Sequence, residues 1–186
     1  MEHLAREQVV SLLTAARAER ERDWVLLLVT FWHGLRASEA VNLTPANFIS
    51  EGYLDVQRLK GSLRTVQPLV EHELEILNER AAVDAWVLHK PKGDRLFPIS
   101  RVQFFRLMRR YGSQAGLPRH LCHPHVLKHS IAMQSIKEAG IENVRQYLGH
   151  KSISSTGAYL KVGDDAASRA IAKATRAPRE PEAVTK

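Results

Sequence analysis

The stretch YLGHKSISSTGAY at residues 147–159 sets the pattern for the whole chain. It joins the end of an apolar-faced helical segment to a serine-rich turn, and it places Tyr159 nine positions after His150. A tyrosine hydroxyl is a weak nucleophile at neutral pH because its ordinary pKa is about 10. To attack a substrate, Tyr159 would need a base and a cationic pocket that stabilises the phenolate.

Three blocks upstream could supply such a pocket. They read GLRASE at residues 34–39, KGSLR at 60–64 and HVLKH at 125–129. With LGH at 148–150 and Tyr159, their order and spacing resemble the catalytic domain of the tyrosine recombinases, the phage integrase family. The resemblance covers roughly residues 5–163. The family block HxxRH has a second arginine where this sequence has Lys128.

The resemblance implies a catalytic site with six members: Arg36, Lys60, His125, Lys128, His150 and Tyr159. Tyr159 would attack the phosphorus of a DNA strand and form a 3′-phosphotyrosine. The cations would neutralise the non-bridging oxygens. Lys60 would protonate the leaving 5′ oxygen, and His125 would either accept the tyrosine proton or hold the hydrogen-bond network in place. No metal and no cofactor are implied, because cationic side chains take that role.

Net charge also favours a polyanionic partner. The 186 residues carry 27 Lys and Arg against 20 Asp and Glu, a net charge of +7. Residues 101–137 contain seven Lys or Arg and no Asp or Glu, which indicates an electrostatic footprint rather than a mixed solvated face. We expect double-stranded DNA as the partner, contacted by Arg58, Arg64, Arg101, Arg106, Arg109, Arg110, Arg119 and Lys151.

Other classes of protein fit the composition less well. Cys122 is the only cysteine, so no intrachain disulfide is possible. The start is charged, and the longest apolar run, residues 24–32, is too short to span a bilayer. These features predict a cytoplasmic, DNA-associated protein without a membrane anchor. The histidines around Cys122 match no structural zinc spacing.

The periodicity predicts a mainly α fold with a small antiparallel β-sheet (α+β), the fold of a tyrosine recombinase catalytic domain. We expect helices over residues 5–20, 21–33, 38–43, 71–82, 101–115, 124–140, 142–148 and 164–176, and a sheet within 48–69 whose hairpin carries Lys60. The helix over 101–115 is expected to bury Val102, Phe105, Leu107 and Met108.

The expected organisation is one catalytic domain over residues 1–176 and a disordered tail over 177–186. Family members usually carry an N-terminal helical domain that clamps the other side of the DNA, and we expect none here. The start at Met1 favours a complete small protein over a fragment. The last helix is expected to dock on a neighbouring protomer on DNA, and accessory proteins could take part.

The leading interpretation is a site-specific recombinase or integrase that cleaves and rejoins DNA without a metal. Lys128 keeps the charge of an arginine but not its bidentate geometry, so cleavage about 10–100-fold slower is expected. One alternative is a DNA-binding regulator of the same fold with a weakened site, in which Tyr159→Phe changes nothing. Another is a type IB topoisomerase, which relaxes DNA without strand exchange.

Overall fold

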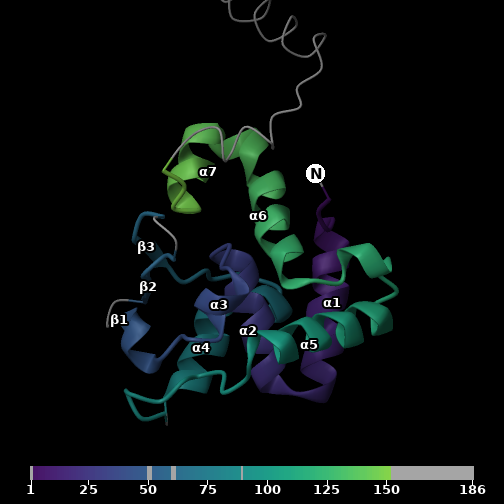
Figure 1. Ribbon diagram of the computed structural model, residues 1–186, viewed down its shortest axis with the longest axis horizontal. Helices are drawn as coiled ribbons and strands as arrows, with labels where there is room; N and C mark the ends of the chain where they lie inside the picture. Colours follow the sequence, from purple (N-terminus) through teal and green to yellow (C-terminus); the bar gives the residue numbers. More distant parts are fainter. Residues whose placement is uncertain (1, 50–51, 60–61, 89, 152–186) are drawn as a thin grey trace, which may run out of the picture.

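The computed structural model describes residues 2–49, 52–59, 62–88 and 90–151 (Figure 1). Its helices are α1 (Arg6–Glu19), α2 (Glu21–Trp32), α3 (Ala37–Ala40), α4 (Glu79–Val87), α5 (Arg101–Gln114), α6 (Pro124–Ala139) and α7 (Ile141–Tyr147). The strands are β1 (Phe48–Ile49), β2 (Tyr53–Val56) and β3 (Thr65–Pro68). Three short 3-10 turns are η1 (Pro45–Asn47), η2 (Glu75–Leu77) and η3 (Arg119–Leu121).

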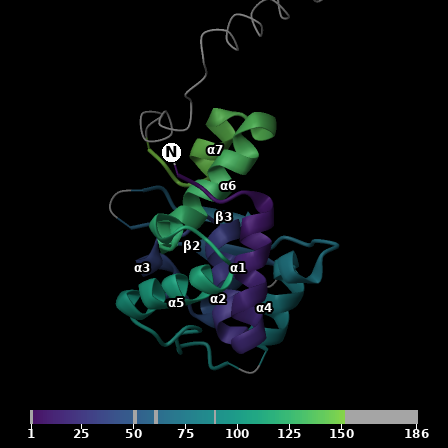
Figure 2. The ribbon, with the colours of Figure 1, turned by 90° about the vertical axis from the view of Figure 1, so that its right-hand side faces the viewer.

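Helix α2 forms the centre of the hydrophobic core. Every residue from Asp23 to Phe31 is buried, so the helix is covered on all sides. It packs against α1, α4 and α6, and α5 crosses α1 at a steep angle (Figure 2). A helix that is apolar all round must lie inside the domain. The central position of α2 fixes the turn that follows it, and that turn carries Arg36.

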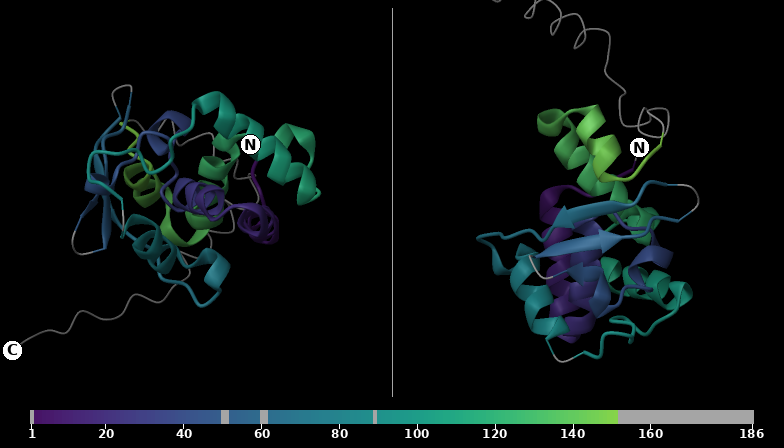
Figure 3. Two further views of the ribbon diagram at one scale, coloured as in Figure 1. Left: turned by 90° about the horizontal axis from the view of Figure 1, so that it is seen from below. Right: turned by 90° about the vertical axis from the view of Figure 1, so that its left-hand side faces the viewer.

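The three strands form one antiparallel sheet in the order β1-β2-β3, on one side of the helices (Figure 3). In β2, Leu54 and Val56 point into the core, while Tyr53 is exposed. In β3, Thr65 and Gln67 are the buried residues, so the inward positions of this strand are polar. Polar side chains facing a core need partners, and here those partners belong to the site described below.

Local sequence explains how α5 and α6 begin. Ser100 accepts a hydrogen bond from the backbone N–H of Gln103 at 3.2 Å, and the Gln103 side chain accepts one from Ser100 N–H at 2.7 Å, which completes a capping box. Pro124 is the first residue of α6, and Gly140 ends it with a positive φ of 78°. The sequence predicted both starts and the end of α6.

The expected inner face of α5 was partly wrong. Phe104 and Met108 are fully buried and Tyr111 is 1% exposed, but Val102 is 61% and Phe105 43% exposed. The inward residues follow a spacing of four and three, which is the helical period, and this spacing leaves Val102 and Phe105 on the outer side. Helix α5 therefore presents apolar side chains among its arginines.

The remaining expectations for the fold were met to different degrees. The sheet and the helices near residues 5–20, 21–33, 124–140 and 142–148 are confirmed. The helix expected over 71–82 is wrong, because η2 ends at Leu77 and α4 starts only at Glu79, after the Asn78 side chain accepts a hydrogen bond from Ala81 N–H. The helix expected over 164–176 and the tail lie outside the described residues. In the described ranges, no helix is long and apolar enough to cross a bilayer.

Candidate active site

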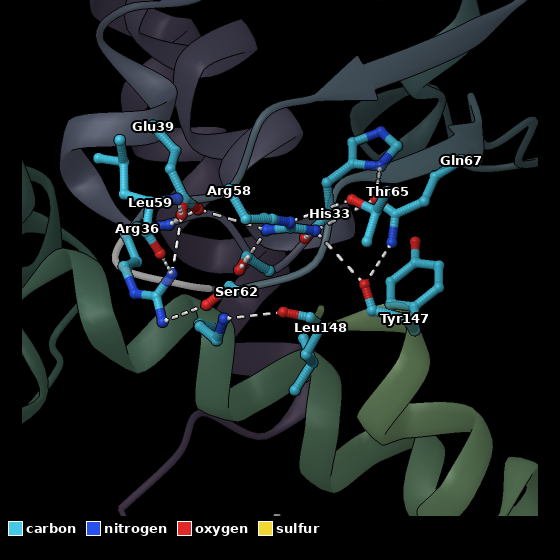
Figure 4. Close-up of polar contacts among 12 residues, drawn as sticks. His33, Arg36, Glu39, Arg58, Leu59, Ser62, Thr65, Gln67, Tyr147 and Leu148 are labelled. Carbon is cyan, nitrogen blue, oxygen red and sulfur yellow. Dashed lines mark hydrogen bonds and ion pairs between the residues drawn. The ribbon is translucent and has the colours of Figure 1, made fainter. Parts of the chain in front are cut away.

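The predicted site begins at the turn between α2 and α3. Arg36 is the N-cap of α3, and Glu39 follows one turn later. The Glu39 carboxylate accepts a hydrogen bond from Arg36 N–H at 2.9 Å and another from its guanidinium at 2.9 Å. The other guanidinium nitrogen of Arg36 donates to Ser62 Oγ at 3.2 Å (Figure 4). Arg36 is therefore oriented from two sides and still half-buried, so a ligand can reach it.

A second arginine, Arg58, lies beneath Arg36. Its guanidinium is completely buried and bonds Glu39 Oε2 at 3.3 Å and Thr65 Oγ1 at 3.0 Å. It also donates to the backbone carbonyls of His33, Gly34 and Tyr147 (Figure 4). Burial lowers the pKa of Arg58 and Glu39 opposes that shift. We expected Arg58 to contact DNA, but in this position its donors already serve the protein interior.

Lys128 reaches the same site from α6. Its side chain is 2% exposed, and Nζ donates to the carbonyl of Leu148 at 3.4 Å. Burial lowers the pKa of Lys128 to about 7, and the charges of Arg58 and Arg36 add to this effect. A lysine is normally charged far above neutral pH. Here the ammonium can lose its proton near neutrality.

The two predicted histidines lie within reach of the same charges. His150 is 8% exposed, and burial together with Lys128 and Arg36 lowers its pKa to about 4. Partial burial and Lys128 also lower the pKa of His125, which stacks edge-on against His129 with ring centroids 4.7 Å apart. The structure thus brings Arg36, His125, Lys128 and His150 together, with both imidazoles neutral at pH 7.

A close approach of two turns holds His150 in place. A Cβ at Gly34, whose φ is 55°, would lie 2.4 Å from the Leu148 side chain. A Cβ at Gly149, whose φ is 68°, would lie 2.7 Å from the carbonyl of Leu63. Leu63 N–H donates to the carbonyl of Gly149 at 3.0 Å. Both positions require glycine: a side chain at Gly34 would push away Leu148, and a side chain at Gly149 would push away the β2–β3 connection.

The predicted residues Lys60 and Tyr159 lie outside the described residues. The described neighbours of Lys60 do meet the site: the Leu59 backbone N–H donates to Glu39 Oε1 at 3.1 Å, and Ser62 accepts from Arg36. Of the predicted DNA contacts, Arg101, Arg106, Arg109, Arg119 and Lys151 are exposed. Arg64 and Arg110 are also exposed but pair with Asp55 and Glu19, respectively.

Two exposed arginines line a hollow beside α5. The hollow has a volume of about 550 Å³ and is lined by Phe105, Arg109, Arg119, His120, Cys122 and His123. His123 lies near enough to lower the pKa of His125. The hollow therefore combines two exposed arginines with a histidine that lies close to His125. Within the described part of the chain, no three His, Cys, Asp or Glu side chains converge to hold a metal ion.

Reading the sequence missed the residues that orient the site. Glu39 belongs to the GLRASE block and lies three positions after Arg36, which on a helix places the two side chains on one face. That spacing was a usable signal. The hydrogen bonds of Arg58 and Gln67 to the carbonyl of Tyr147 link residues that are 89 and 80 positions apart, and no local sequence pattern predicts them.

Chemically, the site is a cationic pocket that contains the carboxylate of Glu39. Arg36, Arg58 and Lys128 face Glu39, whose pKa is lowered despite its burial by hydrogen bonds from Arg36 and Leu59 and by the charge of Arg58. Positive charge therefore exceeds negative charge. Planar guanidinium and ammonium donors around neutral imidazoles suit a phosphodiester group.

Comparison with known proteins agrees with this chemistry. The profile of the phage integrase family matches residues 2–165. The type 1 fimbriae regulatory protein FimB of Escherichia coli (strain K12) is 31% identical over 166 residues, which cover 82% of this chain and 80% of FimB. The tyrosine recombinase XerA of Thermococcus kodakarensis is 30% identical over 165 residues, which cover 86% of this chain and 57% of XerA.

A solved structure shares the fold. The crystal structure of the XerH site-specific recombinase bound to its difH substrate, a pre-cleavage complex, superposes with a TM-score of 0.72 at 20% identity. The match covers 91% of this chain and 53% of XerH. The chain thus spans a little over half the length of XerA and XerH, and the shared part contains the fold that carries the cationic site.

Proposed function

This chain belongs to the phage integrase family and is a recombinase of the tyrosine type, and we propose that it cleaves and rejoins DNA at specific sites through a 3′-phosphotyrosine on Tyr159. The observation that carries this proposal is the convergence of Arg36, Lys128 and His150 in one cationic pocket. Such a pocket stabilises the charge that develops on a phosphoryl group during displacement.

In the proposed reaction, the Tyr159 oxygen attacks phosphorus and the bond from phosphorus to the 5′ oxygen breaks. The phenol proton passes to His125, and Lys60 protonates the departing 5′ oxygen. The neutral state of His125 supports its role as the acceptor. Arg36 and Lys128 hold the non-bridging oxygens. A 5′-hydroxyl of another strand then reverses these steps, so bond energy is conserved and no external co-reactant is required.

We assign the outer face of α5 as the main DNA surface. Arg101, Arg106 and Arg109 are exposed there together with Phe105, beside the hollow that leads toward His125. An α-helix fits the major groove, where arginine reads guanine and apolar groups contact thymine methyls. Because the proposed substrate is DNA, we also propose that the protein acts in the cytoplasm in association with DNA.

Self-association on DNA is the finer part of the proposal. An apolar groove of about 310 Å³ lies between α2, α6 and α7, lined by Trp32, Val70, Ile131, Ala132, Ser135, Ala139, Asn143, Val144, Tyr147 and Leu148. The segment 164–176 carries Ala167, Ala170, Ile171 and Ala174 at helical spacing. We assign this segment of a neighbouring protomer as the occupant of the groove, with accessory proteins as further partners.

The test is covalent capture. Purified protein is incubated with nicked duplexes from its own genomic flanks in the presence of EDTA, and SDS stops the reaction. We expect a protein–DNA adduct with the wild type and with Tyr53→Phe, an exposed tyrosine on β2 that serves as the matched control. Tyr159→Phe should form none.

The outcomes separate the alternatives. A shifted DNA band on a native gel without any adduct would contradict the proposal and indicate a DNA-binding regulator. Relaxation of supercoiled plasmid with an adduct but without strand exchange would indicate a topoisomerase. An adduct that persists in Tyr159→Phe would show that another residue is the nucleophile.

A further inference from the structure

A buried histidine behind the site has a polar partner at each ring nitrogen. His33 is the C-cap of α2, three residues before Arg36, and is completely buried. Its Nδ1 lies 2.8 Å from Oε1 of Gln67, and its Nε2 lies 2.8 Å from Oε1 of Glu79, which is also completely buried. A neutral imidazole carries one N–H and an imidazolium two. The partners therefore determine the charge of this ring.

Two contacts fix the orientation of the Gln67 amide. Its Nε2 donates to the carbonyl of Tyr147 at 2.7 Å, and its Oε1 accepts from Arg58 at 3.4 Å. A carbonyl can only accept and a guanidinium can only donate. Turning the amide over would place oxygen against oxygen and N–H against N–H. Oε1 therefore faces His33, and Nδ1 of His33 must be the donor.

The second nitrogen faces a carboxyl group. Nε2 of His33 and Oε1 of Glu79 have no hydrogen-bond partner among the described residues, although they lie 2.8 Å apart. Since Nδ1 already donates, so short an approach is favourable only if one of these two atoms carries a proton. Glu79 is the first residue of α4, and its Oε2 accepts a hydrogen bond from Val70 N–H at 2.9 Å. A helix N-terminus and a backbone donor both favour the ionised carboxylate. This assigns the proton to His33.

We infer that His33 is held as a buried imidazolium between Glu79 and Gln67, and that this charged pair positions Arg58 and the His150 turn for the DNA cleavage proposed above. The inference rests on the proposed function only for its catalytic consequence. His33 is thus a positioning residue: it does not touch the substrate, and it acts through the groups that do.

Hydrogen bonds and ion pairs connect His33 to the site (Figure 4). The Gln67 amide, whose oxygen accepts from His33, donates to the Tyr147 carbonyl, which also accepts from Arg58 at 3.3 Å. Arg58 donates to the His33 carbonyl at 2.9 Å and pairs with Glu39, the carboxylate that orients Arg36. Tyr147 ends α7, directly before the turn that carries His150. His33 is therefore connected to Arg36 through Arg58 and Glu39, and to the His150 turn through Gln67 and Tyr147.

Loss of one ring proton would break this arrangement. A nitrogen lone pair would then face the oxygen of Gln67 or Glu79 at 2.8 Å, and the amide would turn away from the Tyr147 carbonyl. The charged or titratable groups around the ring are Glu79 from α4, Arg58 from the β2–β3 connection, Tyr147 from α7 and, beside Gly34, the stem of Lys128 from α6.

The first experiment measures the protons directly on the full-length wild type without DNA. Histidine ring nitrogens are labelled with ¹⁵N, and the His33 ring is assigned by its contacts to the Gln67 amide. We expect both ring nitrogens of His33 to carry a proton in the folded protein near neutral pH. A His33 ring with only one protonated nitrogen overturns the inference.

The second experiment replaces the counterion. Glu79→Gln keeps the shape of the side chain, and its amide can donate to a neutral ring, so the second ring proton should be lost. We expect amide hydrogen exchange over residues 145–150 to become about 10-fold faster, and adduct formation about 10-fold slower at unchanged DNA affinity. Glu73→Gln, an exposed carboxylate in the same segment, is the matched control and should resemble the wild type.

Each outcome of these two experiments either supports the inference about His33 or overturns it. Unchanged exchange in Glu79→Gln overturns the positioning role even if the ring is doubly protonated. If the wild type forms no adduct, the proposed function fails, yet ring protonation and exchange still test the inference. If Glu79→Gln does not fold, Gln67→Met removes the contact with Tyr147 and supplies the same exchange test.

Discussion

The surroundings of Lys128 give this lysine an unusually low pKa. The family pattern has an arginine there, and a guanidinium stays charged at every accessible pH. Burial instead lowers the pKa of Lys128 to about 7. The pKa of His150 is lowered to about 4, so this imidazole stays neutral near pH 7, and the pKa of His125 is also lowered. Lys128 is therefore a site cation whose charge changes near neutrality.

This predicts a pH dependence that an arginine would not have. The rate of adduct formation at subsaturating DNA should fall, relative to Lys128→Arg, as pH rises from 6 to 9, because the wild type loses its ammonium and the variant keeps its charge. Taking the ratio of the two rates at each pH cancels effects that both proteins share. Lys137→Arg, at an exposed lysine on the same helix, is the control. A ratio that does not change with pH would mean that Lys128 keeps its proton.

The sequence motifs predicted which side chains come together better than they predicted the surroundings of each side chain. Arg36, His125, Lys128 and His150 converge as the motif spacing indicated. Burial of Arg58 was not foreseeable, because its acceptors come from the α2–α3 turn, from β3 and from α7. The local sequence around an arginine next to a strand does not determine whether its guanidinium faces solvent or buried backbone carbonyls.

At the scale of elements, Arg58 joins the β2–β3 connection to the helices. Arg58→Met should lower the free energy of unfolding by about 3–5 kcal/mol, because Glu39 loses a buried partner and three carbonyls lose a donor. Urea unfolding at pH 7 measures this. Arg64→Met removes a neighbouring arginine that is exposed and should leave the midpoint almost unchanged. Equal losses in the two variants would contradict the structural role of Arg58.

Elements were predictable where local signals exist. The capping box at Ser100, Pro124 at the start of α6 and Gly140 at its end all work within a few residues. The segment 71–82 contains helix formers, yet only η2 and α4 form there. The carboxylate of Glu79 accepts the N–H of Val70 at 2.9 Å, a tertiary contact that overrides propensity.

For the whole molecule, the distribution of charge predicts how it binds. With a net charge of +7, DNA affinity should fall steeply with salt because bound counterions are released. Replacing Arg106 and Arg109 by alanine should reduce the slope of log K against log salt by about 2. Fluorescence anisotropy with duplex DNA, at salt concentrations from about 50 to about 200 mM, measures this slope.

The control for that titration is the basic loop between α4 and α5. Alanine at Lys90 and Lys92 removes the same charge from another part of the surface, and we expect the slope to stay close to that of the wild type. Equal effects of the two pairs would show that DNA binding depends on net charge alone and would contradict the assignment of α5 as the DNA surface.

The cationic pocket has a further consequence for the life of the protein. The positive charges of Arg36, Arg58 and Lys128 repel one another around the carboxylate of Glu39, and a bound polyanion would reduce this repulsion. Whatever binds the folded form and not the unfolded form raises stability. Resistance to proteases should therefore rise with occupancy of DNA. Protein molecules bound to DNA would therefore be degraded more slowly than unbound molecules, and the bound fraction of the protein would increase with time.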